Sequence, residues 1–290
     1  MRIPALMAVL GGCALAQTPG IQEIMARVAE SQAKSLDARR AYVYDQEELL
    51  RMKRPGGKLV REERLNYAVI PSDAGIRKEL IKCAGKYDLH GAFVPYSEPG
   101  YRYKDLDLDG EFMTDIEGST GESKARDGIS HDYFPLTASA QARYNFFLEG
   151  AETVRGRAVY RVRFEPRLRA GHNLGALNLD FDGNDDDDQA SWKGVVLIDA
   201  AEFQPVSVTT DLATKIPLAV KVLLGTDVKG LGFSIAYERF EDGVWFPVSF
   251  GGEFEIRGLF LYRRTISVSL VNKNFRHVDV NSTVAYPSIH

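Results

Sequence analysis

Acidic residues cluster at two places in the sequence, and dense carboxylates are the ligands that calcium prefers. The first cluster, residues 105–110 (DLDLDG), matches the opening of an EF-hand loop, which also needs a bidentate Glu at its twelfth position. That position holds Ile116, and Glu117 comes one residue late. Because residues 105–109 also alternate with period two, we predict a solvated edge strand or turn whose acids point outward.

The second acidic cluster, residues 180–188 (DFDGNDDDD), could bind calcium weakly through its many oxygen atoms. Its ligand spacing is not that of a known calcium loop, and a run of like charges is typical of a mobile, solvated segment. Calcium binding by this loop stays open, and we predict no specific metal site.

Candidate catalytic residues are sparse. The five histidines are His90, His131, His172, His277 and His290. They form neither H-x-x-x-H nor H-E-x-x-H, so the sequence does not support a zinc site. His131 and Asp132 could form an orienting pair, but the sequence has no G-x-S-x-G motif. Cys83 lies in a predicted strand and is expected to be a small buried hydrophobe. A hydrolase that uses His131 or Cys83 is the least favoured of three function hypotheses, and the other two are given below. We predict no catalytic residue and no cofactor.

Apolar residues alternate along several predicted strands, which places each set on one face of a sheet. Aromatic residues are also dense in the later strands, so this face could be an ordinary core or a concavity that holds an acyl chain. Core and cavity lining use the same residue types. The candidate ligand-binding residues are Tyr160, Val162, Phe164, Val206, Val208, Phe254, Ile256, Ile266, Val268 and Leu270.

The first sixteen residues read as an export signal. Arg2 precedes an apolar run, and Ala14-Leu15-Ala16 fits the A-x-A cleavage pattern, which makes Gln17 the first mature residue. Residues 10–13 (LGGC) also resemble a bacterial lipobox, so Cys13 is a possible lipid anchor. We therefore expect an exported protein of the periplasm, either free or membrane-associated.

Composition narrows the function classes. The chain has 290 residues, of which 44% are hydrophobic and 26% are charged, with a formal net charge of −4. These values are typical of a folded globular protein, and the charge lacks the basic excess of a nucleic-acid-binding protein. No run of eighteen apolar residues occurs, so we predict no transmembrane segment.

The predicted elements are one helix and about ten or eleven strands. Apolar residues recur with helical spacing from Ile21 to Ala29, and such a stripe must cover the face of a sheet. The many charges of the first strands, as in residues 61–64 (REER), predict that one face of the sheet is exposed to water. Near the end, we expect separate strands over Val244–Phe254, Glu255–Arg264 and Thr265–Val271.

The fold class is therefore mainly β with α: a single curved antiparallel sheet covered by an N-terminal helix. We predict one domain over residues 17–290, with irregular insertions near 97–140 and 167–191. No internal repeat or linker divides the chain.

The stretch Ile198–Val206 (IDAAEFQPV) has the form ID-x-x-x-F-x-P-V. With an export signal, one amphipathic helix and long strands in hairpins, it resembles the periplasmic lipoprotein-carrier superfamily, the LolA/LolB-like proteins of the outer-membrane lipoprotein-sorting type. The chain also resembles secreted proteins of Acidobacteria-type bacteria. The superfamily resemblance covers about residues 20–275 and implies an unclosed half-barrel whose concave face binds acyl chains or lipoproteins. It transfers no ligand-contacting residue to this chain.

Two function classes follow. In the first, the chain is a non-enzymatic, exported binding protein that holds an acyl chain, a lipid or a lipoprotein in the half-barrel. In the second, it is a cell-envelope sensor or scaffold module with a filled core that binds another envelope protein.

Overall fold

A computed structural model describes most of the chain. The described residues are 19–72, 75–120, 136–167, 192–212, 227–230, 232–240, 242–258 and 262–278. The predicted signal peptide, Cys13, His131 and the acidic loop at 180–188 lie outside them.

The described residues form three helices and twelve strands. The helices are α1 Ile21–Arg39, α2 Leu108–Thr120 and α3 Ala138–Gln141. The strands are β1 Tyr42–Lys53, β2 Leu59–Ser72, β3 Gly75–Leu89, β4 Ala92–Tyr96, β5 Tyr144–Val154, β6 Arg157–Pro166, β7 Trp192–Asp199, β8 Pro205–Leu212, β9 Asp227–Lys229, β10 Ser234–Arg239, β11 Trp245–Arg257 and β12 Arg263–His277.

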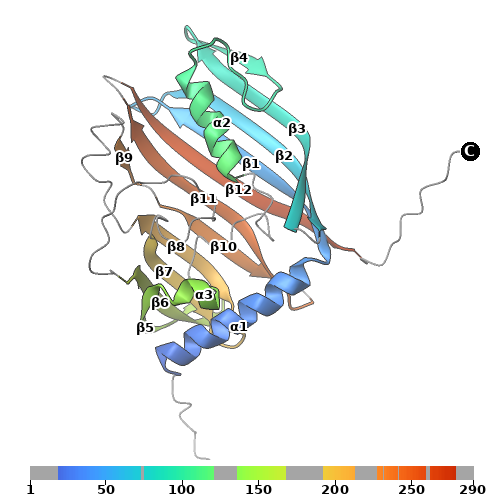
Figure 1. Cartoon of the computed structure of the whole chain (residues 1–290), viewed down its shortest axis with the longest axis vertical. Helices are drawn as coiled ribbons and strands as arrows, with labels where there is room; N and C mark the ends of the chain where they lie inside the picture. Colours follow the sequence, from blue (N-terminus) through green and yellow to red (C-terminus); the bar gives the residue numbers. More distant parts are fainter. Residues whose placement is uncertain are drawn as a thin grey trace, which may run out of the picture.

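All twelve strands belong to one sheet, with the order β4-β3-β2-β1-β12-β11-β10-β8-β7-β6-β5 and the short β9 paired to β11. Every pairing is antiparallel. β4 and β5 stand at the two ends of the order, so the sheet is not closed (Figure 1). The prediction of one unclosed antiparallel sheet with an N-terminal helix is confirmed.

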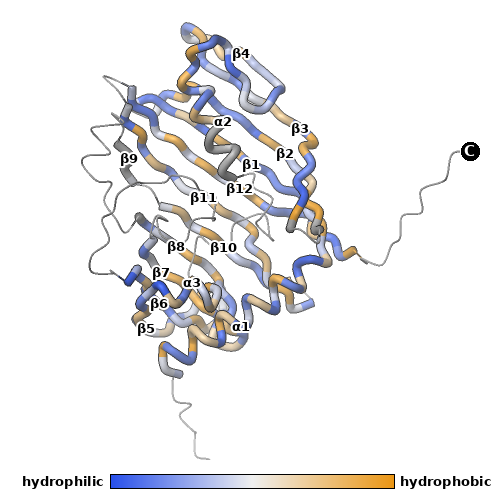
Figure 2. The backbone as a smooth tube through the Cα atoms, in the orientation of Figure 1, coloured by the Kyte–Doolittle hydropathy of each residue, from blue (hydrophilic) through white to orange (hydrophobic). Residues whose placement is uncertain are grey.

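Helices lie over one face of the sheet, which we call the inner face. α1 crosses one end of the sheet and α2 lies over the half that contains β1 and β2 (Figure 1). The predicted stripe of α1 faces inward, since Ile24, Met25 and Val28 are buried. In β1, every second residue from Tyr42 to Met52 is buried, as expected for a strand with one covered face. Hydrophobic and hydrophilic residues accordingly mix along the strands (Figure 2).

Several boundaries differ from the prediction. Residues 105–109 are not an edge strand, because Asp107 precedes a helix and its side chain caps that helix. β11 passes through Phe254 to Arg257 and β12 runs from Arg263 to His277, so the predicted breaks at 254/255 and 264/265 are wrong. Alternating charges in this region mark the outer face of continuous strands rather than turns. β5 was not predicted.

Candidate ligand-binding face

The inner face carries one large apolar cluster that reaches across most of the sheet. It includes side chains from β1 and β12 through β11, β10, β8 and β7 to β6, and from α1 and α2. All ten predicted ligand-binding residues belong to it: Val162, Phe164, Val208, Ile256, Ile266, Val268 and Leu270 are buried, and Tyr160, Val206 and Phe254 are partly buried against it. The alternation in the sequence therefore placed these residues together; their contact with a ligand stays a prediction.

The nine-residue stretch of the family resemblance attaches α1 to the sheet. Gln204 Nε2 donates to the Ser31 carbonyl at 2.9 Å and to Ser35 Oγ at 2.8 Å. Gln204 Oε1 accepts from Gln32 Nε2 at 2.6 Å, and the Ser31 hydroxyl donates to the Glu202 carbonyl. The turn between β7 and β8 thus positions the helix that covers this end of the inner face.

The same turn holds a charged network that the sequence did not reveal. Glu202 accepts from Trp245 Nε1 at 2.9 Å, from Arg157 at 3.0 Å and from Arg239 at 2.7 Å. Asp199 accepts from Arg157 Nε at 2.6 Å and from the backbone amide of Glu202 at 2.8 Å. Burial raises the pKa of the Glu202 carboxyl, but its three donors outweigh this effect and hold the pKa below its usual range. The network joins β6, β7 and β11 around the turn.

The β1–β2 half of the inner face is polar as well as apolar. Gln46 and Glu48 of β1 and Arg61 and Glu63 of β2 are each about 1% exposed. The water-exposed face predicted from residues 61–64 carries Glu62 and Arg64, whereas Arg61 and Glu63 point inward. Charge alone does not tell which face of a strand is wet, because period two assigns both faces equally well.

Arg61 connects this polar region to α2. Its guanidinium donates to Asp107 Oδ2 at 2.9 Å, and Asp107 Oδ1 accepts from the Gly110 amide at 3.1 Å as the cap of α2. A side chain at position 110 would have its Cβ 2.5 Å from the Arg61 guanidinium, so any residue larger than glycine would displace the Arg61–Asp107 pair. The pattern that resembled a calcium loop is thus a helix start that seats a buried arginine.

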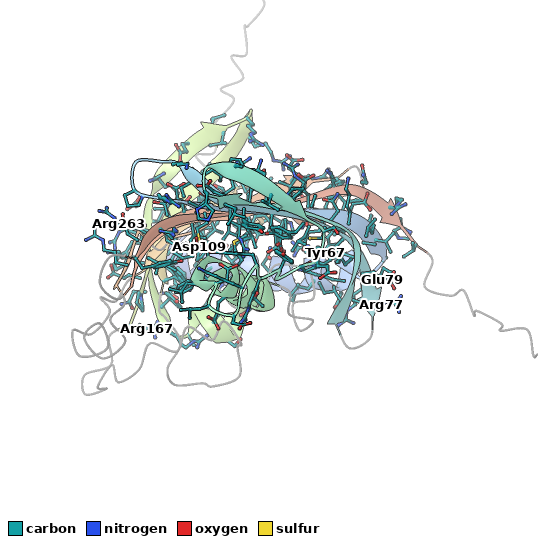
Figure 3. All side chains as sticks on the ribbon, turned by 90° about the horizontal axis from the view of Figure 1, so that it is seen from above. Tyr67, Arg77, Glu79, Asp109, Arg167 and Arg263 are labelled. Atoms are coloured by element: carbon teal, nitrogen blue, oxygen red, sulfur yellow. The ribbon has the colours of Figure 1, made fainter. Side chains whose placement is uncertain are left out.

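A second acid of that helix start also faces inward. Asp109 accepts from Tyr262 Oη at 2.8 Å and from Arg264 Nε at 2.9 Å, so it ties α2 to β12. Figure 3 shows Asp109 and Tyr67 within the layer of side chains inside the sheet, whereas Arg77, Glu79 and Arg263 lie near its margins. Asp107 and Asp109 therefore both attach the start of α2 to the sheet.

The catalytic candidates show no catalytic arrangement among the described residues. Burial, together with the nearby charge of Glu63, raises the pKa of the Cys83 thiol to about 11, which opposes thiolate formation at neutral pH. His90 lies in the β3–β4 turn, and His277 packs edge-on against Tyr42. Within the described ranges, no group of three His, Cys, Asp or Glu side chains could hold a metal ion.

No protein-family model matches the chain, and no curated protein matches it. Several solved structures are similar. An outer membrane lipoprotein-sorting protein domain from Vibrio parahaemolyticus has 12% identity and a TM-score of 0.40, over 91% of this chain and 96% of that one. A LolA superfamily protein from Nitrosomonas europaea has 10% identity and a TM-score of 0.32, over 91% and 96%.

The lipoprotein LppX from Mycobacterium tuberculosis has 9% identity and a TM-score of 0.28, over 90% of this chain and 100% of that one. Each of these three structures is a protein to which the chain is similar. With TM-scores of 0.40 and below, they say nothing about a ligand. Among the described helices, none combines the length and the apolar character needed to cross a membrane.

Proposed function

We propose that the chain is an exported, non-enzymatic binding protein that holds an acyl chain, a lipid or a lipoprotein against the inner face of its sheet. The observation that supports this most is the apolar cluster, which extends from β6 to β1 on one face of an unclosed sheet. An acyl chain would be stabilised there by about 0.8 kcal/mol for each CH₂ group that it buries. The periplasm is the expected location, with Cys13 as a possible lipid anchor.

Native mass spectrometry of the exported protein, starting at Gln17, tests this proposal. We expect one bound lipid or acylated peptide per chain, which organic extraction would release and identify. A bare polypeptide that also binds no fluorescent fatty acid would contradict it. In a matched pair, Phe254→Ala should lower occupancy because Phe254 packs on the inner cluster, whereas Val271→Ala, exposed on the outer face, should not.

A sensor or scaffold module remains the second candidate, and one observation favours it. Large apolar side chains are exposed near the β4 end of the sheet: Leu80 at 44%, Ile81 at 66% and Phe93 at 47%. An unpaired edge strand beside exposed apolar residues suits β-strand addition by a partner protein. Capture of an envelope protein that depends on Ile81 and Phe93, together with a lipid-free chain, would favour this function instead.

A further inference from the structure

The polar part of the inner face contains five charged groups from neighbouring strands and from the cap of α2. They are Glu48, Arg61, Glu63, Lys78 and Asp107. The strand registers place Glu48 and Glu63 diagonally on β1 and β2, since Glu48 lies opposite Leu65 and Glu63 lies opposite Leu50. Lys78 of β3 lies opposite Val69 of β2 and therefore shares this face. Leu50 belongs to the large apolar cluster, so the polar region directly adjoins the proposed acyl-binding surface.

The charges of this region do not cancel. Arg61 and Asp107 form one pair, with both side chains at most 3% exposed. Lys78 is close enough to Glu48 for the carboxylate to act against the effect of burial, which lowers the pKa of that lysine. Among the described residues of this region, Glu63 is then the acid without a cation of its own, because Arg61 already holds Asp107.

The Glu63 carboxylate is buried without adequate donors. The residue is 1% exposed, and neither of its oxygens has a hydrogen-bond partner within the part of the chain that the structure describes. The Tyr96 hydroxyl also lacks a partner there. Burial dominates and raises the pKa of Glu63, although the Tyr96 hydroxyl as a nearby donor, the Arg61 charge and the Gly100 backbone donor lower it partly. A buried acid of this kind is costly unless a donor reaches it.

We propose that Glu63 binds the protonated primary amine of an amphiphilic ligand whose acyl chain lies on the adjoining apolar cluster. This inference rests on the proposed function and specifies its ligand class. An ammonium group carries three N–H donors and one positive charge, which would satisfy both Glu63 oxygens and neutralise the region. A third donor could reach the unpartnered acceptor lone pairs of the Tyr96 hydroxyl. Glu63 is thus a specificity residue for the headgroup.

Binding of three amphiphiles with the same chain tests this assignment: dodecylamine, dodecanol and dodecyltrimethylammonium, titrated below their micellar concentrations at neutral pH. The amine supplies charge and N–H donors, the quaternary compound supplies charge alone, and the alcohol is uncharged. We expect the amine to bind about tenfold more tightly than the alcohol, with the quaternary compound weaker than the amine. Glu63→Gln should remove this preference.

Glu62→Gln is the matched control, because Glu62 immediately precedes Glu63 in β2, points outward and pairs with Arg51 and Lys86. It should keep the preference for the amine. Equal binding of amine and alcohol by the unmodified chain would overturn the headgroup assignment and leave the proposed function standing. A preference that survives Glu63→Gln would also overturn it. If none of the three compounds binds, the proposed function fails together with this inference.

Discussion

The Arg61 guanidinium donates to the Asp107 carboxylate at 2.9 Å, and the two side chains are 1% and 3% exposed. This pair joins the second strand to the capping residue of α2, forty-six positions later. Because Asp107 also caps that helix, one carboxylate both neutralises a buried arginine and fixes where α2 begins. Loss of the acid removes both functions at once.

Asp107→Ala should therefore destabilise the protein strongly. It leaves Arg61 buried and unpaired, for which about 3–5 kcal/mol is typical. Asp107→Asn should cost less, since asparagine caps a helix nearly as well as aspartate does. Urea unfolding measures both free energies, and Asp105→Ala, at an exposed position, should change the free energy by no more than about 0.5 kcal/mol. Equal stabilities of the two Asp107 variants and the unmodified chain would contradict this account.

Gln204→Ala should loosen α1 from the sheet. The substitution removes two donated hydrogen bonds and one accepted bond, each with a net contribution of about 1 kcal/mol. Hydrogen exchange should show faster exchange over Ile21–Arg39 than in the unmodified chain, with β11 and β12 changed much less. Lys34→Ala is the control, because Lys34 lies on the exposed side of α1. Uniform loss of protection across the sheet would show that Gln204 supports the whole fold instead.

Glu202→Gln should weaken the protein at neutral pH and not in acid. The folded state lowers the pKa of Glu202, so its stabilisation is present above the unfolded-state pKa and disappears as the pH falls through the folded-state value. Glu202 is one-third exposed, which keeps the expected cost near about 1–2 kcal/mol. Urea unfolding at a series of pH values, followed by far-ultraviolet circular dichroism, tests this. If the free energies of unfolding of the variant and the unmodified chain changed in parallel with pH, the prediction would be refuted.

Glu63→Gln should stabilise the ligand-free protein, with the opposite pH dependence. The folded state raises the pKa of Glu63, so the folded chain holds a proton that the unfolded chain releases. Stability then falls as the pH rises from the unfolded-state pKa to the folded-state value, by at most about 1.4 kcal/mol per pH unit for one group. Glu63→Gln lacks the carboxyl group, so its free energy of unfolding should not show this decrease with pH. Glu62→Gln, on the outer face, should retain it.

Cys83 should react slowly with iodoacetamide until the solution is strongly alkaline, because its pKa is raised to about 11 by burial and by Glu63. Glu63→Gln removes the neighbouring charge and should lower the pH at which alkylation reaches half its maximal rate. An unchanged midpoint in this variant would mean that burial alone sets the reactivity of the thiol.

Regular strands with one covered face were predictable from the sequence. The β-branched residues Val195, Val196 and Ile198 predict a strand over Trp192–Asp199, and β7 has these bounds. α2 was missed for the opposite reason. Its sequence, LDGEFMTDIEGST, contains two glycines and a weak apolar stripe, and the five residues around Asp107 happen to alternate. The cap spacing from Asp107 to Gly110 was the signal that could have revealed it.

The polar part of the inner face could not have been predicted from local pattern. Arg61 and Glu63 read as surface residues because charged side chains are seldom buried without partners. The partner of Arg61, Asp107, comes from a distant segment whose position depends on the whole fold. The sequence predicted the apolar set of the candidate site and missed its charged set for this reason.

The first described strand, β1, pairs with the last described one, β12, and among the described strands this pairing alone connects β4-β3-β2-β1 with the rest. The first four strands can form hairpins early, but β1 keeps an unpaired edge until residues 263–277 arrive. Until β12 pairs with it, the free edge of β1 can form hydrogen bonds with strands of other chains. Contacts this far apart in sequence also slow folding. A chain truncated before β12 should therefore aggregate rather than fold partially, because the open edge of β1 would have no strand to pair with.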